Sequence, residues 1–232
     1  MTQPFDICIR GAGIVGRTLA LHLAAKQLRV ALVAPADKPV AVLTAPLPDV
    51  RAYALNLLSR QWLEAVRCWP DTSDATPVLS MQVQEDDGGQ VAFHASESGS
   101  DALNWIVDVP ALEARLQEAV RFQPFIEVVE SPQPAALTVV CEGRTSSTRQ
   151  EWGVDWDVKP YDQWALATRV RCAQPHAQVA RQWFHQGEIL AFLPLGGPEG
   201  NLCAIVWSVS PERAQTLQAL EAEEFCQALQ TA

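Results

Sequence analysis

Three glycines near the amino terminus have the spacing of a phosphate-binding turn. Gly11, Gly13 and Gly16 form the pattern Gly-x-Gly-x-x-Gly, with Ile14 and Val15 between the second and third glycines. In such a turn the first glycine allows a sharp bend, the second lets a pyrophosphate approach the backbone, and the third lets helix and strand pack closely. The free amides and the dipole of the helix N-terminus favour an anion. The pattern therefore predicts a site for the ADP half of a dinucleotide, built from these five residues.

The elements around the turn are those that this motif requires. Residues 5–10 and 29–33 predict two short buried strands. Between them, residues 14–26 predict a helix in which apolar residues recur at every fourth position from Val15 to Leu23. Strand, turn, helix and strand together form a βαβ unit of roughly 30 residues. This context favours a dinucleotide site over a glycine turn without a ligand.

One expected feature of the site is missing. An acidic residue normally follows the second strand and accepts hydrogen bonds from the ribose hydroxyls. Here Ala34 holds that position, and Asp37 comes later, in a proline-rich stretch over 35–50 that we expect to be a loop. Ala34 also lacks the arginine chemistry that a 2′-phosphate requires, so NADP is not favoured.

Beyond this unit the chain mixes helical and strand-like segments. Apolar spacing predicts helices around 55–66 and 110–122, the second with Leu112, Leu116 and Val120 facing inward. Strands are expected within 79–107, on either side of the turn Asp86-Asp87-Gly88-Gly89, and at 125–129, 136–141, 164–170, 179–184, 189–195 and 202–207. Short connections between the last four runs predict an antiparallel sheet, and Ser210 begins a helical stretch.

Composition narrows the set of partners. With 17 basic and 27 acidic residues the net charge is −10, which disfavours nucleic acid and simple docking to anionic lipid. No apolar run is long enough for a transmembrane helix, and the N-terminus lacks the order of a signal peptide. We therefore expect a cytoplasmic protein, with peripheral membrane contact left open. The six cysteines form no CxxC pair, so we expect reduced thiols and no metal site.

A second segment, Val139 to Arg149, carries a resemblance to a known family. It resembles the Asp-Gly motif of flavoprotein aromatic hydroxylases, with Glu142-Gly143 in place of Asp-Gly and with serine and arginine following. Arg51, in the stretch 51–55, resembles the arginine that this family places near the flavin. The resemblance implies that Arg51, Glu142 and Gly143 also contribute to cofactor binding.

Further segments extend the resemblance over nearly all 232 residues. They are similar to the substrate-domain sheet and following helix of the ubiquinone-biosynthesis hydroxylases, the 2-polyprenyl-6-methoxyphenol hydroxylase group. The segments are 153–156, 160–163, 184–187, 190–195, 204–208 and 224–229. This resemblance implies an FAD-dependent monooxygenase that takes electrons from NAD(P)H and hydroxylates a small aromatic, polyprenyl phenol-like ring. The flavin supplies that chemistry, so no catalytic side chain is assigned.

The resemblance also implies a domain organisation. We expect an α/β fold with a discontinuous Rossmann-type FAD-binding domain over 1–78 and 108–155. An inserted substrate domain with an antiparallel sheet is expected over 79–107 and 156–232. The family's C-terminal FAD-domain segment has no counterpart here, so a fragment of a longer protein and a reduced relative are both open. Either way, the chain alone is expected to hold FAD weakly or not at all and to lack turnover, and its unpaired sheet edge leaves a homodimer open.

Several alternatives remain open at this level. The leading hypothesis is an FAD-dependent hydroxylase, and the alternative is a non-catalytic relative that serves as a binding or scaffold subunit. An NAD-dependent dehydrogenase is disfavoured by Glu142-Gly143 and by the lack of a dehydrogenase catalytic set. Trp164, Trp183 and Trp207 fall on the expected sheet, where they either line an aromatic pocket or pack in the core.

Overall fold

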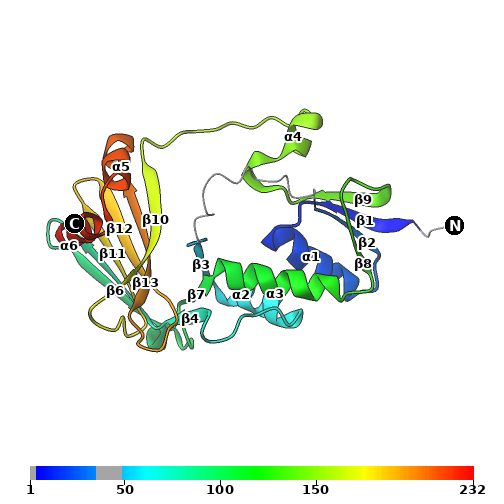
Figure 1. Ribbon diagram of the computed structural model, residues 1–232. Coiled ribbons are helices and arrows are strands. Elements are labelled where there is room, and N and C mark those ends of the chain that lie inside the picture. The colour runs from blue at the N-terminus through cyan, green and yellow to red at the C-terminus, as the bar shows by residue number, and fades with distance from the viewer. Residues whose placement is uncertain (1–3, 35–48) are drawn as a thin grey trace. The chain divides into compact units, whose positions relative to one another are not determined.

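The computed structural model describes residues 4–34 and 49–232, which form two compact units (Figure 1). The first unit contains the described residues before 35, with Leu58–Trp69 and Pro110–Val158. The second contains Asp49–Leu57, Pro70–Val109 and Lys159–Ala232. Residues 49–57 and 70–78, which the sequence grouped with the nucleotide domain, therefore pack within the second unit.

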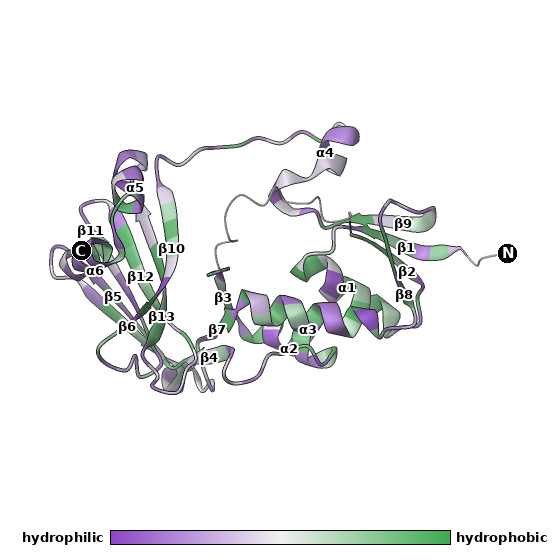
Figure 2. Cartoon of the chain, in the orientation of Figure 1, coloured by the Kyte–Doolittle hydropathy of each residue, from purple (hydrophilic) through white to green (hydrophobic). Residues whose placement is uncertain are grey.

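The first unit is built on a parallel four-stranded sheet with the order β8-β2-β1-β9. Its strands are β1 (Phe5–Arg10), β2 (Val30–Val33), β8 (Ile126–Val129) and β9 (Ala135–Val140). Every position of β2 is apolar and buried, as a strand enclosed on both faces of a parallel sheet should be (Figure 2). Helix α1 (Ile14–Ala24) joins β1 to β2, which confirms the predicted βαβ unit.

The buried face of α1 does not follow the apolar row that predicted the helix. Its buried residues are Gly16, Ala20, Leu21 and Ala24, whereas Val15 is 68% exposed. The apolar row from Val15 to Leu23 therefore predicted the helix but does not mark its buried side. Small residues at every fourth position let the helix axis approach the sheet closely, and this outweighs the larger apolar gain of burying valine.

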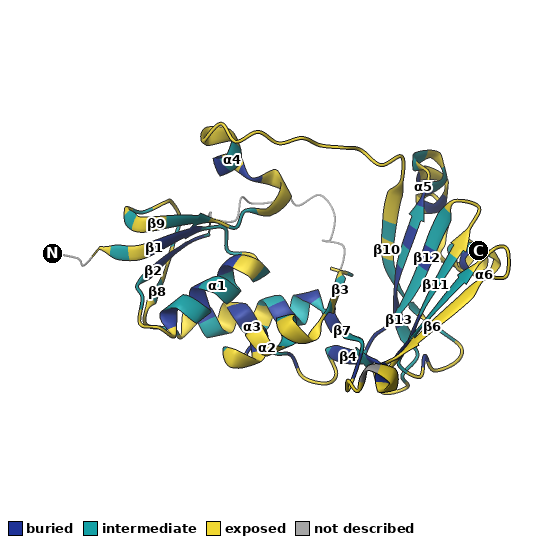
Figure 3. Cartoon of the chain, turned by 180° about the vertical axis from the view of Figure 1, so that it is seen from behind, coloured by how far each residue is buried: buried dark blue, intermediate teal, exposed yellow. Residues whose placement is uncertain are grey.

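Three further helices belong wholly or largely to the first unit. They are α2 (Leu57–Ala65), α3 (Val109–Arg121) and α4 (Ser147–Glu151), with a short 3₁₀ turn at Gly143–Thr145. In α3 the predicted inward residues Leu112, Leu116 and Val120 are all buried. In α2 only Leu63 is buried, so the apolar spacing across 55–66 did not identify the buried side of that helix (Figure 3).

The second unit contains a six-stranded sheet with the order β10-β13-β12-β11-β5-β6. Its strands are β5 (Ser80–Glu85), β6 (Gln90–His94), β10 (Trp164–Arg171), β11 (Val179–His185), β12 (Glu188–Pro194) and β13 (Leu202–Val209). The four later strands pair antiparallel as expected. However, β5 pairs parallel with β11, so the sheet as a whole is mixed.

A smaller antiparallel sheet completes the second unit. It has the order β3-β7-β4, formed by Ala52–Leu55, Asn104–Asp108 and Ala75–Val78, and a 3₁₀ turn covers Ala95–Ser98. Because β7 pairs with both β3 and β4, it ties residues 49–57 and 70–78 to this unit. This pairing is the physical reason why the domain boundaries differ from those expected from the sequence.

Two helices, α5 (Pro211–Gln218) and α6 (Ala222–Thr231), contribute to the core on one face of the large sheet. Trp207 is fully buried in this core and meets Phe225 edge-on, while Trp183 meets Phe192 in the same way. Core packing is therefore the correct interpretation for Trp207. Trp183 packs partly buried against the same core, whereas Trp164 is 48% exposed. No helix among the described residues is long and apolar enough to cross a membrane.

Candidate nucleotide-binding site

The glycine turn lies between the end of β1 and the start of α1, where two of its glycines are required by packing. Gly11 has a φ of +112°, and a Cβ there would lie 2.5 Å from the carbonyl oxygen of Cys141. A Cβ on Gly16 would lie 1.9 Å from the carbonyl oxygen of Gly11. Backbone meets backbone at both positions, so neither residue can carry a side chain without movement of the main chain.

Gly13 is different, because its surroundings are open. It is the N-cap of α1, with ordinary backbone angles (φ −76°, ψ −173°), and a Cβ there would meet no atom within 4 Å. Among the described residues no side chain caps this helix, and its first turn contains no acidic residue. In the part of the chain that the structure describes, no capping side chain occupies the amides that begin α1, including those of Ile14 and Val15, and such amides can bind a pyrophosphate.

Ala34 lies at the end of the second strand, as the sequence predicted. Ala34 follows β2 directly, and its amide donates to the carbonyl oxygen of Val129 over 2.9 Å. The methyl group of Ala34 cannot accept a hydrogen bond, so this strand end offers no side-chain acceptor to a ribose. Asp37 lies outside the described residues.

The second motif lies beside the first at the carboxyl edge of the sheet. β9 is the parallel neighbour of β1, and the amide of Cys141 donates to the carbonyl oxygen of Arg10 over 2.7 Å. Glu142 and Gly143 follow at once, and Gly143 has a φ of +70° with open space around its Cα. The fold thus brings Glu142 and Gly143 to the same edge as the glycine turn, where ligands of open parallel sheets bind.

The Glu142 carboxylate is held by groups that the sequence did not single out. It accepts hydrogen bonds from Ser146 Oγ at 2.6 Å, Thr148 Oγ1 at 2.7 Å and the Thr148 amide at 3.0 Å, and Arg10 Nε lies 3.6 Å away. Burial alone would raise the pKa of Glu142, but these hydrogen bonds and the Arg10 charge together lower it. The serine and threonine four and six residues later were a local signal, whereas Arg10 gave none.

Arg51 belongs to the second unit and is engaged there. Its Nε and Nη2 atoms contact both carboxylate oxygens of Asp49 at 2.6–3.0 Å, and Arg51 lowers the pKa of Asp49 to about 2. Its carbonyl oxygen accepts a hydrogen bond from Arg169 over 3.1 Å. The contribution of Arg51 to cofactor binding stays a prediction.

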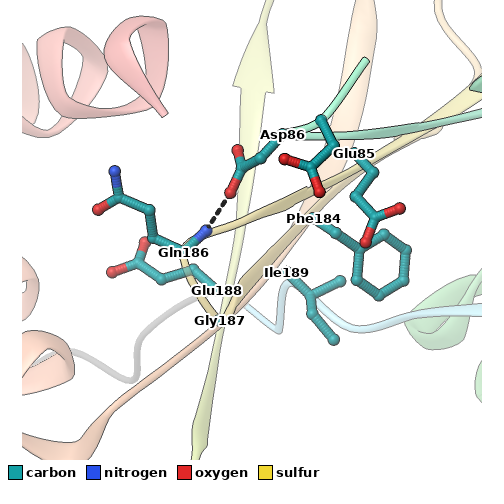
Figure 4. Close-up of a pocket in the computed structure, with 8 residues that line it drawn as sticks. Glu85, Asp86, Phe184, Gln186, Gly187, Glu188 and Ile189 are labelled. Carbon is teal, nitrogen blue, oxygen red and sulfur yellow. Dashed lines mark hydrogen bonds between the residues drawn. The ribbon is translucent and has the colours of Figure 1, made fainter. Parts of the chain in front are cut away.

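An open hollow of about 360 Å³ lies where the β5–β6 and β11–β12 turns meet (Figure 4). Phe184 and Ile189 supply its apolar surface, and its other lining residues are Glu85, Asp86, Asp87, Gln186, Gly187 and Glu188. Asp86 pairs with His185 and accepts a hydrogen bond from the Gln186 amide over 2.7 Å. That backbone hydrogen bond is the main reason why the pKa of Asp86 is lowered. Across the described residues, no group of three or more metal-ligating side chains could hold a metal.

Comparison with known proteins gives relatives over nearly the whole chain. It is 27% identical to 3-demethoxyubiquinol 3-hydroxylase of Escherichia coli, over 93% of this chain and 60% of the relative. It is 28% identical to ubiquinone hydroxylase UbiL of Rhodospirillum rubrum, over 95% of this chain and 55% of the relative. It is 27% identical to ubiquinone biosynthesis monooxygenase COQ6 of Drosophila melanogaster, over 100% of this chain and 55% of the relative. No family model matches the chain.

Solved structures share the fold. PqsL of Pseudomonas aeruginosa, a probable FAD-dependent monooxygenase, has a TM-score of 0.77 at 22% identity, over 98% of this chain and 67% of that one. p-Nitrophenol 4-monooxygenase PnpA of Pseudomonas putida has a TM-score of 0.70 at 14% identity, over 99% of this chain and 62% of that one. The chain spans 55–60% of the three ubiquinone-pathway relatives. The predicted resemblance is confirmed: the chain is similar over nearly its whole length to the ubiquinone-biosynthesis hydroxylases and has the α/β fold found in FAD-dependent monooxygenases.

Proposed function

We propose that the chain supplies the ADP-binding part and the ring-binding sheet of an FAD-dependent monooxygenase that hydroxylates a phenolic or quinone-precursor ring. One observation carries this proposal. The glycine turn packs closely at Gly11 and Gly16 but leaves open space at Gly13, beside Glu142-Gly143 at the same sheet edge. A turn that needed only to be compact would have no reason to leave that space in front of an uncapped helix.

The residues of the chain have defined tasks in this proposal. The amides of Gly13, Ile14, Val15 and Gly16 bind the pyrophosphate of FAD, and the backbone at Gly143 faces the rest of the cofactor. The bound flavin, reduced by NAD(P)H, supplies the oxygen-transfer chemistry. Arg51 is proposed as a further cofactor residue on the strength of the sequence resemblance alone.

A second candidate function is a non-catalytic binding or scaffold subunit derived from such a hydroxylase. Two observations favour it: Ala34 offers no acceptor to the ribose, and the Glu142 oxygens are already engaged by Ser146 and Thr148. A flavin spectrum at near-stoichiometric content in the purified protein would exclude this candidate.

The direct test is an FAD titration followed by quenching of flavin fluorescence. We expect saturable binding by the native chain and loss of binding in Gly13→Asp, because the carboxylate would occupy and repel the pyrophosphate position. Equal FAD affinity for the two proteins would refute the assignment of the turn. Activity is tested separately, with NADH and a short-chain polyprenylphenol, by following NADH oxidation and product mass.

Two further properties expected from the sequence are proposals of the same kind. The first is a homodimer that forms through an edge of the parallel sheet. Light scattering should then give twice the mass of one chain, at a fraction that rises with protein concentration. Peripheral membrane contact predicts co-flotation with neutral liposomes. A monomer at all concentrations, or a protein that stays with the aqueous fractions, contradicts the corresponding proposal.

A further inference from the structure

Arg10 connects the glycine turn to the segment that follows β9. It is the last residue of β1, directly before Gly11, and its side chain is only 14% exposed. Its Nη2 donates to Glu151 Oε2 over 2.9 Å, its Nε lies 3.6 Å from Glu142 Oε1, and its guanidinium lies over the Trp152 ring at 5.9 Å. One side chain therefore contacts both ends of the segment 142–152.

Glu142 provides the other half of this connection. An ionised carboxylate has about four sites for hydrogen-bond donors. Ser146 Oγ, Thr148 Oγ1 and the Thr148 amide occupy three of them, and Arg10 Nε lies 3.6 Å from Oε1, an ion-pair distance without a hydrogen bond. The side chain has thus little capacity left for a ligand, and its contacts hold the turn and the start of α4 in place.

The position of this segment matters for the glycine turn because the two backbones are in close contact. A Cβ on Gly11 would lie 2.5 Å from the Cys141 carbonyl oxygen, and the Cys141 amide bonds to the carbonyl oxygen of Arg10. The bend at Gly11 therefore rests on the residue just before Glu142. A displacement of that residue must change the bend and the amides that follow it.

We propose that Arg10 and Glu142 form a latch that positions the glycine turn, so that Glu142 serves the nucleotide site without touching the flavin. This inference rests on the proposed function, since it concerns how the same site is kept in shape. Arg10 and Glu142 are positioning residues in this proposal. The ADP half of the cofactor depends on the latch as strongly as the complete cofactor does.

The test compares affinities for FAD and for ADP, which lacks the flavin half. The variants are Arg10→Met, Glu142→Gln and the double variant, with Arg144→Met as the control. Arg144 is exposed in the same segment, so its replacement removes the same charge as Arg10→Met and leaves the latch intact. Each single variant is expected to bind both ligands about tenfold more weakly, the double variant no more weakly than either, and the control within about twofold.

Several results would overturn the inference. A loss confined to FAD, with ADP unaffected, would show that Glu142 contacts the flavin half directly. Losses that multiply in the double variant would show that the two residues act independently. If the native chain binds neither ligand, the proposed function fails and the latch has no nucleotide site to position. If the native chain binds both ligands and the variants bind them equally well, the latch alone is refuted.

Hydrogen exchange tests the latch without a ligand. Arg10→Met should speed exchange at the amides of Thr148 and Arg149, which bond to Glu142 and Ser146, while the amides of β2 stay protected. Unchanged exchange at these two amides would overturn the latch. If Arg10→Met does not fold, Arg10→Lys provides the comparison, since it keeps the charge and loses the planar fork that reaches Glu142 and Glu151 together.

Discussion

Replacing Gly16 with alanine should destabilise the first unit because α1 cannot remain against the β1–α1 turn. The new Cβ would lie 1.9 Å from the Gly11 carbonyl oxygen, and no flexible side chain can move aside. Overpacking of this kind costs about 1–3 kcal/mol, and contact between two backbones places the cost near 3. Alanine regains about 1 kcal/mol of helix propensity over glycine. We therefore expect a net loss of about 2 kcal/mol in the free energy of unfolding.

Gly13→Ala is the matched contrast. No atom lies within 4 Å of the added Cβ, and the backbone angles suit any residue. The cost should be about 1 kcal/mol or less, which is the difference between glycine and the much poorer N-cap alanine. The methyl group would nevertheless stand where the pyrophosphate is proposed to approach, so ADP affinity should fall at least about tenfold.

The assay is urea unfolding followed by circular dichroism and tryptophan fluorescence, with ADP titrations of the same preparations. Gly16→Ala should lower the unfolding midpoint, and Gly13→Ala should leave it nearly unchanged while losing ADP affinity. A Gly16→Ala protein as stable as the native one would refute the close approach of α1. Unchanged ADP affinity in Gly13→Ala would refute the glycine turn as the phosphate site.

Three more measurements follow from the same structure. Ala34→Glu should raise FAD affinity by at least about tenfold, because one charge-assisted hydrogen bond to a ribose hydroxyl contributes about 1.5–3 kcal/mol; weaker binding would contradict its place at the ribose. Because folding lowers the pKa of Glu142, its stabilising contribution is complete above the ordinary glutamate pKa and is lost as pH falls through the lowered value. Glu142→Gln should therefore flatten the stability profile in that acidic range, and an unchanged profile would argue against the Glu142 contacts. Arg169→Met should cost about 3 kcal/mol, because it removes the 2.6 Å ion pair between Arg169 and the largely buried Asp108. Arg171→Met, which removes an exposed pair on the same strand, should cost less than about 1 kcal/mol in the same unfolding assay, and equal losses would contradict this account.

The sequence by itself determined the elements whose signals are local. Two short apolar strands, a glycine turn and a helix within the first 33 residues were sufficient for the βαβ unit, because glycine geometry and apolar spacing act over a short range. The inward face of α3 was equally predictable, since Leu112, Leu116 and Val120 repeat at every fourth position. The contacts of Glu142 with Ser146 and Thr148 could also have been predicted, since these two residues follow Glu142 by only four and six positions.

Only the tertiary structure decided the contacts between distant segments. The parallel pairing of β5 with β11 joins residues about one hundred positions apart, and the sequence of neither strand indicates which strand it pairs with. The same holds for Arg10, whose partner Glu142 lies beyond several intervening elements, and for the division of residues 49–78 between the two units. On α1 the buried face followed Gly16 and Ala20, because the distance between helix and sheet is set by what both surfaces allow. Hydrophobicity along one chain segment reports how much a residue gains from burial, whereas the opposing surface decides which residue has room to be buried.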